Sequence, residues 1–195
     1  MWSTGYIMKK YIVVDNFFNE PDSFRNFALQ QKFYDKDNHP HDGLDAFPGK
    51  RTDYFNDTNS QFFKDVNDKI RQPLCELDDV NDLVGTNVNC LLQISFSYTL
   101  KGMNTPIHTD PVAPGYKSRY GGVVYLNPEI TWDRARDTGT TLYLKEETIN
   151  IENKYNRLLL YNSNIKHQPT DNFGDDINNS RLVMTIFYDL APMPI

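Results

Sequence analysis

The chain has 195 residues, a length that suits a single domain with a sizeable buried core. Hydrophobic residues make up 39% and aromatic residues 13% of it, which is typical of a globular chain rich in strand-favouring side chains. A formal net charge of −6 and a pI of about 5.1 argue against a protein that binds through phosphate contacts, so we expect no nucleic-acid partner.

The first part of the chain predicts a strand followed by two helices. A short apolar run within residues 9–15 is typical of a strand. Asn19 is expected to cap a helix that has Pro21 in its first turn and apolar residues at helical spacing. Residues 60–72 show the same spacing and predict a second amphipathic helix. The polar residues 33–58 between them are interpreted as a long loop, and loops of this length tend to be functional.

From residue 88 onward the pattern changes to short strands. Apolar and polar residues alternate from Leu92 to Tyr98, which is the signature of a half-buried strand. Further strands are predicted over residues 119–127, 140–145, 157–162 and 181–189. Short strands separated by turn residues indicate an antiparallel sandwich or jelly roll, so we expect a mainly β fold with flanking helices.

The domain organisation follows from these elements. The helices cannot bury their apolar faces without the sheets, so we predict a single domain over residues 1–195. Within it, residues 1–87 would buttress the core with the N-terminal strand, the helices and the long loop. Residues 88–190 would form the jelly-roll core that carries the chemistry.

The most informative motif is His108-Thr109-Asp110, which follows the alternating strand. Side chains alternate with period two in an extended segment, so the imidazole of His108 and the carboxylate of Asp110 point to one face. His167 comes far downstream, from another strand or loop, and Arg181 opens the last predicted strand. Two histidines and one carboxylate form the facial triad that binds non-haem Fe(II) and leaves coordination positions open. His108, Asp110 and His167 are therefore the predicted metal ligands and catalytic centre.

The order of these residues resembles that of the Fe(II)/2-oxoglutarate-dependent dioxygenases, and within them the prolyl-4-hydroxylase-like branch. The resemblance rests on the four residues just named and on flanking words at 139–143 and 156–163. It spans residues 88–190, roughly half of the chain. It implies a double-stranded β-helix core, an Fe(II) cofactor and 2-oxoglutarate as co-substrate.

The resemblance also implies roles in binding the co-substrate. Arg181 would take the distal carboxylate of 2-oxoglutarate in a two-pronged grip. Thr185 shares a strand face with Arg181 and would add a hydroxyl hydrogen bond, and Tyr98 matches a tyrosine that helps to hold the co-substrate in relatives. The sequence departs from the pattern at Val183, where many relatives carry Ser or Thr, and prolyl hydroxylases usually have Lys in place of Arg181.

The implied reaction is hydroxylation of a substrate C–H bond, while 2-oxoglutarate is converted to succinate and CO2. The substrate is expected to be a peptidyl side chain or a small molecule. It would bind at a rim built by the long loop and by residues 111–118 and 128–138. Candidate rim residues are Lys50, Arg51, Trp132, Arg134 and Arg136.

Two other classes of protein remain open. One is a non-catalytic jelly-roll protein whose metal site is structural, and the other is a hydrolase that uses zinc as a Lewis acid on the same three ligands. His39, His41 and Asp42 form a second candidate cluster within the long loop, although a Pro-containing loop of this kind is more often a turn.

Cysteine usage and hydropathy indicate the compartment. Cys75 and Cys90 give no disulfide framework in a chain of this size, and we expect both to be reduced thiols. The N-terminal residues lack the apolar segment of a signal peptide, and no apolar run is long enough to cross a membrane. We therefore expect a cytoplasmic protein without a membrane partner.

Overall fold

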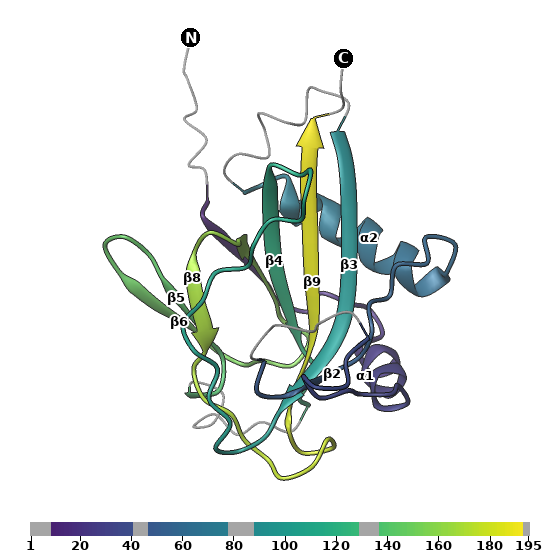
Figure 1. The fold of residues 1–195 in the computed structure, drawn as a ribbon, viewed down its shortest axis with the longest axis vertical. Helices are drawn as coiled ribbons and strands as arrows, with labels where there is room; N and C mark the ends of the chain where they lie inside the picture. The colour runs from purple at the N-terminus through teal and green to yellow at the C-terminus, as the bar shows by residue number, and fades with distance from the viewer. Residues whose placement is uncertain (1–8, 41–46, 78–87, 129–136, 193–195) are drawn as a thin grey trace.

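Two antiparallel sheets and two helices make up the part of the chain that the structure, a computed structural model, describes: residues 9–40, 47–77, 88–128 and 137–192. The elements are β1 (Tyr11–Val14), α1 (Pro21–Leu29), β2 (Lys50–Arg51), α2 (Gln61–Leu74), β3 (Val88–Thr99), β4 (Ser118–Tyr125), β5 (Thr140–Tyr143), β6 (Thr148–Ile151), β7 (Leu158–Asn162), β8 (Lys166–Pro169) and β9 (Arg181–Pro192). The larger sheet has the order β1-β7-β4-β9-β3-β2, and the smaller one has the order β6-β5-β8 (Figure 1). This arrangement confirms the predicted mainly β fold with flanking helices.

The two helices begin close to where the sequence predicts them. Ser60 caps α2, because its hydroxyl accepts a hydrogen bond from the Phe63 amide at 3.2 Å. The prediction for α1 was wrong at the cap: Glu20 takes that position without a side-chain hydrogen bond, and Pro21 supplies the first helical residue. The side chain of Asn19 instead accepts a hydrogen bond from Lys69 of α2 at 3.3 Å.

The two central strands of the larger sheet each have one apolar and one polar face. Strands β3 and β9 pair along their full length, from Thr99 opposite Arg181 to Val88 opposite Pro192. In both strands, alternate side chains enter the main hydrophobic cluster under the helices, while the intervening ones point to the other face. The residues that enter the cluster from β3 are Leu92, Ile94 and Phe96, and those from β9 are Leu182, Met184, Ile186, Tyr188 and Leu190.

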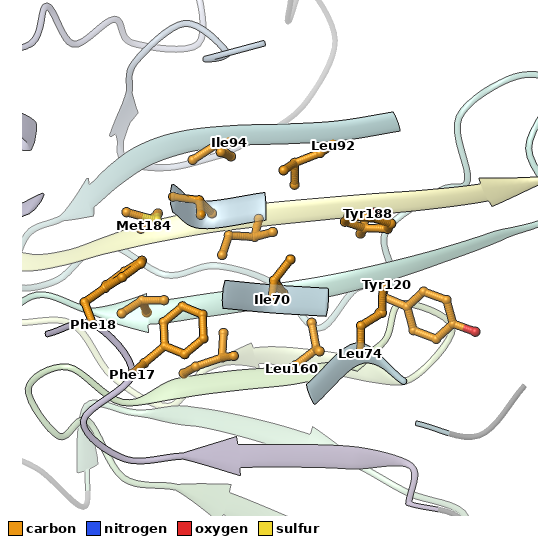
Figure 2. Packing of buried hydrophobic residues seen from close by; sticks show 14 of the residues in the cluster. Phe17, Phe18, Ile70, Leu74, Leu92, Ile94, Tyr120, Leu160, Met184 and Tyr188 are labelled. Atoms are coloured by element: carbon orange, nitrogen blue, oxygen red, sulfur yellow. The ribbon is translucent and has the colours of Figure 1, made fainter. Parts of the chain in front are cut away.

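The main hydrophobic core lies between α1, α2 and the larger sheet (Figure 2). Ile70 and Leu74 of α2 share this cluster with Leu92 and Ile94 of β3, and Phe17 and Phe18 lie at one end of it. Burying a side chain of this size stabilises the fold by about 1.5–3 kcal/mol, and this core therefore holds the larger sheet rigid.

A second hydrophobic cluster joins the two sheets. It contains Leu142 of β5, Ile151 of β6, and Leu159 and Tyr161 of β7. The cluster fixes the smaller sheet against the larger one. Beside it lies a pocket between the sheets, which is lined by both polar and apolar side chains.

Each predicted strand is present, but three short strands were not predicted. They are β2, β6 and β8, which span two to four residues. β2 and β8 lack an apolar alternation, and the alternation in β6 covers only four residues. The segment predicted as one loop over residues 33–58 is tied to the edge of the larger sheet, because β2 pairs with β3 and Phe55 forms a bridge with Ile94. Among the described residues, no helix is both long and apolar enough to span a membrane.

Candidate metal centre and active site

Three predicted ligands meet at the open edge of the pocket. His108 and Asp110 lie on the segment that leads from β3 to β4, and His167 lies on β8. His108 and His167 form a two-way backbone bridge, with N–O distances of 3.0 and 2.9 Å. The amide of Asp110 donates to the carbonyl of Ser163 at 3.2 Å. These backbone bonds hold two segments that are far apart in sequence in one register, so the three side chains converge.

In this triad of His108, Asp110 and His167, the atoms that can bind a metal point toward one another. One ligand atom from each of His108, Asp110 and His167 lies within 4.8 Å of the others. Nε2 of His108 is 3.7 Å from Oδ1 of Asp110, and Nε2 of His167 is 3.4 Å from Oδ2. A small cation between them fits this spacing, because each ligand atom would approach it to about 2.0–2.2 Å.

The tautomer of each imidazole is set by the backbone two residues before it. Nδ1 of His108 lies 2.9 Å from the carbonyl of Pro106, and Nδ1 of His167 lies 2.9 Å from that of Ile165. A carbonyl oxygen only accepts, so Nδ1 carries the proton in both rings and the Nε2 lone pairs point toward Asp110. This is the arrangement in which neutral histidine binds a metal ion.

The carboxylate of Asp110 is the clearest sign that a ligand belongs here. Its Oδ2 atom is buried and has no hydrogen-bond donor among the described residues. A buried carboxylate oxygen without a donor costs free energy, and a bound cation removes that cost. Burial also lowers the pKa of His167, more than Asp110 raises it, so this imidazole stays neutral and able to bind a metal.

Arg181 lies deeper in the same pocket and is 4% exposed. Its Nε donates to the Thr138 carbonyl at 2.9 Å, and its Nη2 donates to the Gly139 carbonyl and the Thr140 hydroxyl at 3.0 and 3.2 Å. Burial is the main cause that lowers the pKa of this guanidinium, and no carboxylate among the described residues opposes it. Tyr125 also forms a hydrogen bond with this guanidinium, and the two-pronged grip on a carboxylate stays a prediction.

The other two predicted co-substrate residues have different placements. Thr185 lines the pocket on the same face as Arg181, and its hydroxyl is 3.2 Å from that of Ser97. Tyr98 does not reach the pocket: it points to the opposite face of the larger sheet, where its ring packs edge-on against Phe33 at 5.0 Å. Strand alternation explains this, since Tyr98 shares its face with Phe96, which is in the main core.

Several pocket residues were not among the sequence-based predictions. Thr140 accepts hydrogen bonds from both Arg181 and Tyr125, at 3.2 and 2.7 Å, so its own proton is left for the pocket. Tyr161 packs against the ring of His167 with centroids 4.6 Å apart, and burial, followed by the charge of Asp110, raises its pKa well above the usual value. The alternation that groups Thr185 with Arg181 would have found the pocket face of β9, but not these two.

The pocket is small, with a cavity volume of about 120 Å³. Its lining from the larger sheet includes Ser95, Ser97, Val123, Val183, Thr185 and Phe187. Polar hydroxyls and one buried guanidinium therefore face the metal triad across a space that suits a small anionic molecule.

The structure describes only two of the five residues predicted to form the rim of the substrate site. Arg51 lines the pocket, whereas Lys50 is exposed on the other side of β2. Trp132, Arg134 and Arg136 lie outside the described residues.

Only one residue of the second candidate cluster, which comprises His39, His41 and Asp42, lies in the described part of the chain. His39 is buried, with Nε2 2.9 Å from the Thr52 carbonyl, while His41 and Asp42 lie outside the described residues. His39 thus holds the loop against the segment that follows β2.

The fold of this chain is similar to that of several solved structures. No family model matches the chain, and no curated protein matches it in sequence. A prolyl-4-hydroxylase from Pseudomonas putida has the same fold, with a TM-score of 0.64 at 10% identity over 94% of this chain and 92% of that one. The chain has the fold of the Fe(II)/2-oxoglutarate-dependent oxygenases. The predicted double-stranded β-helix is therefore confirmed.

Two further structures with this oxygenase fold have been solved with ligands. HygX from Streptomyces hygroscopicus, with nickel, 2-oxoglutarate and hygromycin B bound, has a TM-score of 0.63 at 14% identity, over 96% of this chain and 85% of that one. A prolyl hydroxylase from Trichoplax adhaerens, in complex with a hypoxia-inducible-factor peptide, has a TM-score of 0.64 at 13% identity, over 94% of this chain and 84% of that one. The fold thus holds both small-molecule and peptide ligands in these proteins.

Proposed function

We propose that this protein is a non-haem Fe(II)- and 2-oxoglutarate-dependent oxygenase that hydroxylates a peptidyl side chain or a small molecule. The observation that carries the proposal is the buried Asp110 oxygen without a donor, which lies between two imidazoles whose Nε2 lone pairs are directed at it. The oxygenase fold and the buried Arg181 in the same pocket support it.

His108, Asp110 and His167 would hold the iron. Two neutral nitrogen ligands and one anionic oxygen ligand suit Fe(II), and they leave positions open for other molecules. Bound Fe(II), together with 2-oxoglutarate and O2, supplies the oxidising power for attack on a C–H bond, with release of succinate and CO2. The chain itself contributes binding, orientation and exclusion of water.

The co-substrate would lie in the pocket between the two sheets, which we call the inner pocket. Arg181 would donate to its distal carboxylate, and the hydroxyls of Thr140 and Thr185 would add hydrogen bonds from two sides. A carboxylate there also compensates the charge of the buried guanidinium. Tyr98 is left out of this site because it lies on the other face of the sheet.

Tyr161 would shield the iron side of the pocket from water. Its ring covers His167, and its raised pKa keeps the phenol protonated at neutral pH, so it brings no second negative charge beside Asp110. The binding of hygromycin B by HygX and of a peptide by the Trichoplax enzyme supports both kinds of substrate for this chain.

The proposal is tested by measuring succinate formation from 2-oxoglutarate. The protein is loaded with Fe(II) without oxygen, its weak metal-to-ligand absorption band is recorded on adding 2-oxoglutarate, and oxygen is then admitted. We expect the band and the succinate in the wild type, and the loss of both in His108→Ala. In Arg181→Gln we expect the affinity for 2-oxoglutarate to fall by about 10- to 100-fold, because a hydrogen bond to a charged group is removed.

Ile107→Ala is the matched control for His108→Ala. Its side chain is 50% exposed and is not part of the pocket lining, so this variant should retain the band and the turnover. A wild type that holds Zn(II) tightly and shows neither 2-oxoglutarate binding nor turnover would contradict the proposal and favour a zinc hydrolase or a structural metal site.

A further inference from the structure

A second cavity opens from the first at the metal triad. It has a volume of about 220 Å³, and we call it the outer cavity. The two cavities share Phe47, Arg51, Thr105, His108, Asp110 and Phe187 in their linings. A substrate that reaches the metal side of the inner pocket from this direction therefore passes Arg51 and Thr105.

Thr105 carries a hydroxyl that lacks a partner. The residue is 7% exposed, and its Oγ1 atom is buried without a hydrogen bond among the described residues. Buried side-chain oxygens almost always have a partner, since leaving one without costs about 1–3 kcal/mol. Because this oxygen lies in the wall shared by both cavities, the missing partner is best supplied by a ligand.

Arg51 is held at the same junction by its backbone and by an aromatic ring. Its backbone forms a two-way bridge with Tyr34, with N–O distances of 2.8 and 2.9 Å, and β2 pairs it with Ser97 of β3. The guanidinium lies over the ring of Phe47, 5.3 Å from the centroid. A guanidinium has five N–H donors in a fixed plane, which allows Arg51 to bind a ligand in addition to its contacts within the protein.

The other charged groups of the outer cavity already have roles. Arg119 forms a two-pronged ion pair with Asp189, at 2.8 and 2.9 Å, and Asp110 faces the proposed metal. Arg51 and Thr105 lie, with His108 and Asp110, in the wall that both cavities share. A cation held in the triad would offset the charge of Asp110, and Arg51 would then give the junction a positive charge, although the chain as a whole carries a net charge of −6.

We infer that Arg51 and Thr105 form a subsite for an oxyanion, a carboxylate or a phosphate, carried by the primary substrate. The inference rests on the proposed function, because it places this oxyanion next to the site of hydroxylation. One oxyanion accepts hydrogen bonds from the guanidinium and from the hydroxyl together, and it is the partner that Thr105 lacks. A neutral amide of the same size would gain much less, since it offers a weaker acceptor to the guanidinium.

The experiment uses paramagnetic relaxation of small probes by Mn(II) placed in the triad. The protein is loaded with Mn(II), with and without saturating 2-oxoglutarate, and the proton relaxation of N-acetylglycine, N-acetylglycinamide and methyl phosphate is measured. We expect about tenfold more relaxation enhancement for the acid or the phosphate than for the amide. The stronger of the two anions identifies the source of the oxyanion, and equal enhancement of all three probes would overturn the inference.

Substitutions of Arg51 and Thr105 test whether these two residues cause the preference for the anion. Arg51→Gln and Thr105→Val should remove the preference for the anion, whereas Lys50→Gln and Thr148→Val, at exposed positions away from both cavities, should keep it. Thr105→Val is close in shape and removes a buried hydroxyl without a partner, so its unfolding temperature should not fall. A preference that persists in Thr105→Val and Arg51→Gln would assign the anion to another group.

The two proposals fail in different ways. If 2-oxoglutarate does not bind but the anion preference is present and depends on Arg51, the proposed oxygenase is wrong and the subsite stands. If 2-oxoglutarate binds and yields succinate while the three probes behave alike, the subsite is wrong and the oxygenase stands.

Discussion

The two faces of the larger sheet are made by the same strands and differ in almost every chemical respect. On the face under the helices, β3 and β9 present Ile94, Phe96 and Met184, all fully buried among apolar neighbours. On the other face the same strands present Ser97 and Arg181, which line the pocket. Period-two alternation sorts the residues, so each strand stabilises the fold with one set of side chains and builds the site with the other.

This division means that stability and ligand binding are separable at neighbouring positions. A substitution on the core face should lower the free energy of unfolding and leave the pocket chemistry alone, as long as the protein folds. A substitution on the pocket face should do the reverse, because its polar side chains contribute little to the core.

The largest effect is expected on the core face. Phe96→Ala removes a fully buried ring that contacts Phe27, Phe55 and Phe62, so it should lower the free energy of unfolding by about 3–5 kcal/mol. Its neighbour Ser97→Ala, on the pocket face, should cost about 1 kcal/mol, for a single hydrogen bond. Urea unfolding of both variants measures the difference, and equal losses would contradict the division of the two faces.

At the metal triad we expect a large loss of metal affinity without a loss of stability. Asp110→Asn should lower the affinity for Fe(II) or Mn(II) by about 100-fold, since it removes the anionic ligand. The metal-free variant should be as stable as the wild type, because the lost charge was buried without a donor. Metal titration and thermal unfolding of the metal-free protein test this together. A large loss of stability without metal would show that Asp110 serves the core.

Two adjacent glycines sharpen the comparison. A Cβ on Gly121 would lie 3.1 Å from the ring of Tyr161 and 3.2 Å from Oδ2 of Asp110, both at the pocket. One on Gly122 would lie 3.3 Å from Leu160 on the core face. Gly121→Ala should therefore lower metal affinity by about tenfold, through displacement of the carboxylate. Gly122→Ala should instead cost about 1–3 kcal/mol of stability and keep metal binding. The same metal titration distinguishes them, and it would count against our interpretation if the two variants exchanged effects.

The smallest effect belongs to a residue on neither face. Asp15 accepts from Arg157 at 2.6 Å and from Lys154 at 2.7 Å, and the hydrogen bond from Arg157 is the main cause that lowers its pKa from 3.8 to about 2. Its charged form is favoured by folding, so this stabilisation is present above pH 3.8 and is lost as the pH falls toward 2. Asp15→Asn should cost less than about 1 kcal/mol at neutral pH, because the pair is partly exposed. Unfolding measured between these pH values should depend less on pH in the variant than in the wild type.

The sequence predicts the longer strands and the grouping of His108 with Asp110, because both depend on short-range patterns. The alternation from Leu92 to Tyr98 specifies β3 together with its two faces. It groups Tyr98 with Phe96, whereas the assignment of Tyr98 to the co-substrate site rested on the resemblance and went against this pattern. The His108–Asp110 spacing needs only an extended segment to bring two side chains to one side.

The pocket could not be predicted in full, because it depends on long-range register. His167 lies on β8, whose residues show no apolar alternation, and its place is set by the pairing of β8 with β5 and by the bridge to His108. Thr140 and Thr105 enter the site only when the smaller sheet and the segment after β3 close over the larger sheet. No local pattern encodes these closures.

The backbone bridge between His108 and His167 also determines when the site can exist. Closing so long a stretch of chain has an entropic cost, which the backbone bridge and the strand pairing of β8 help to offset. During synthesis the triad cannot assemble until β8 has left the ribosome, and the larger sheet is incomplete until β9 follows. A nascent chain that ends before β8 therefore offers at most two of the three predicted ligands.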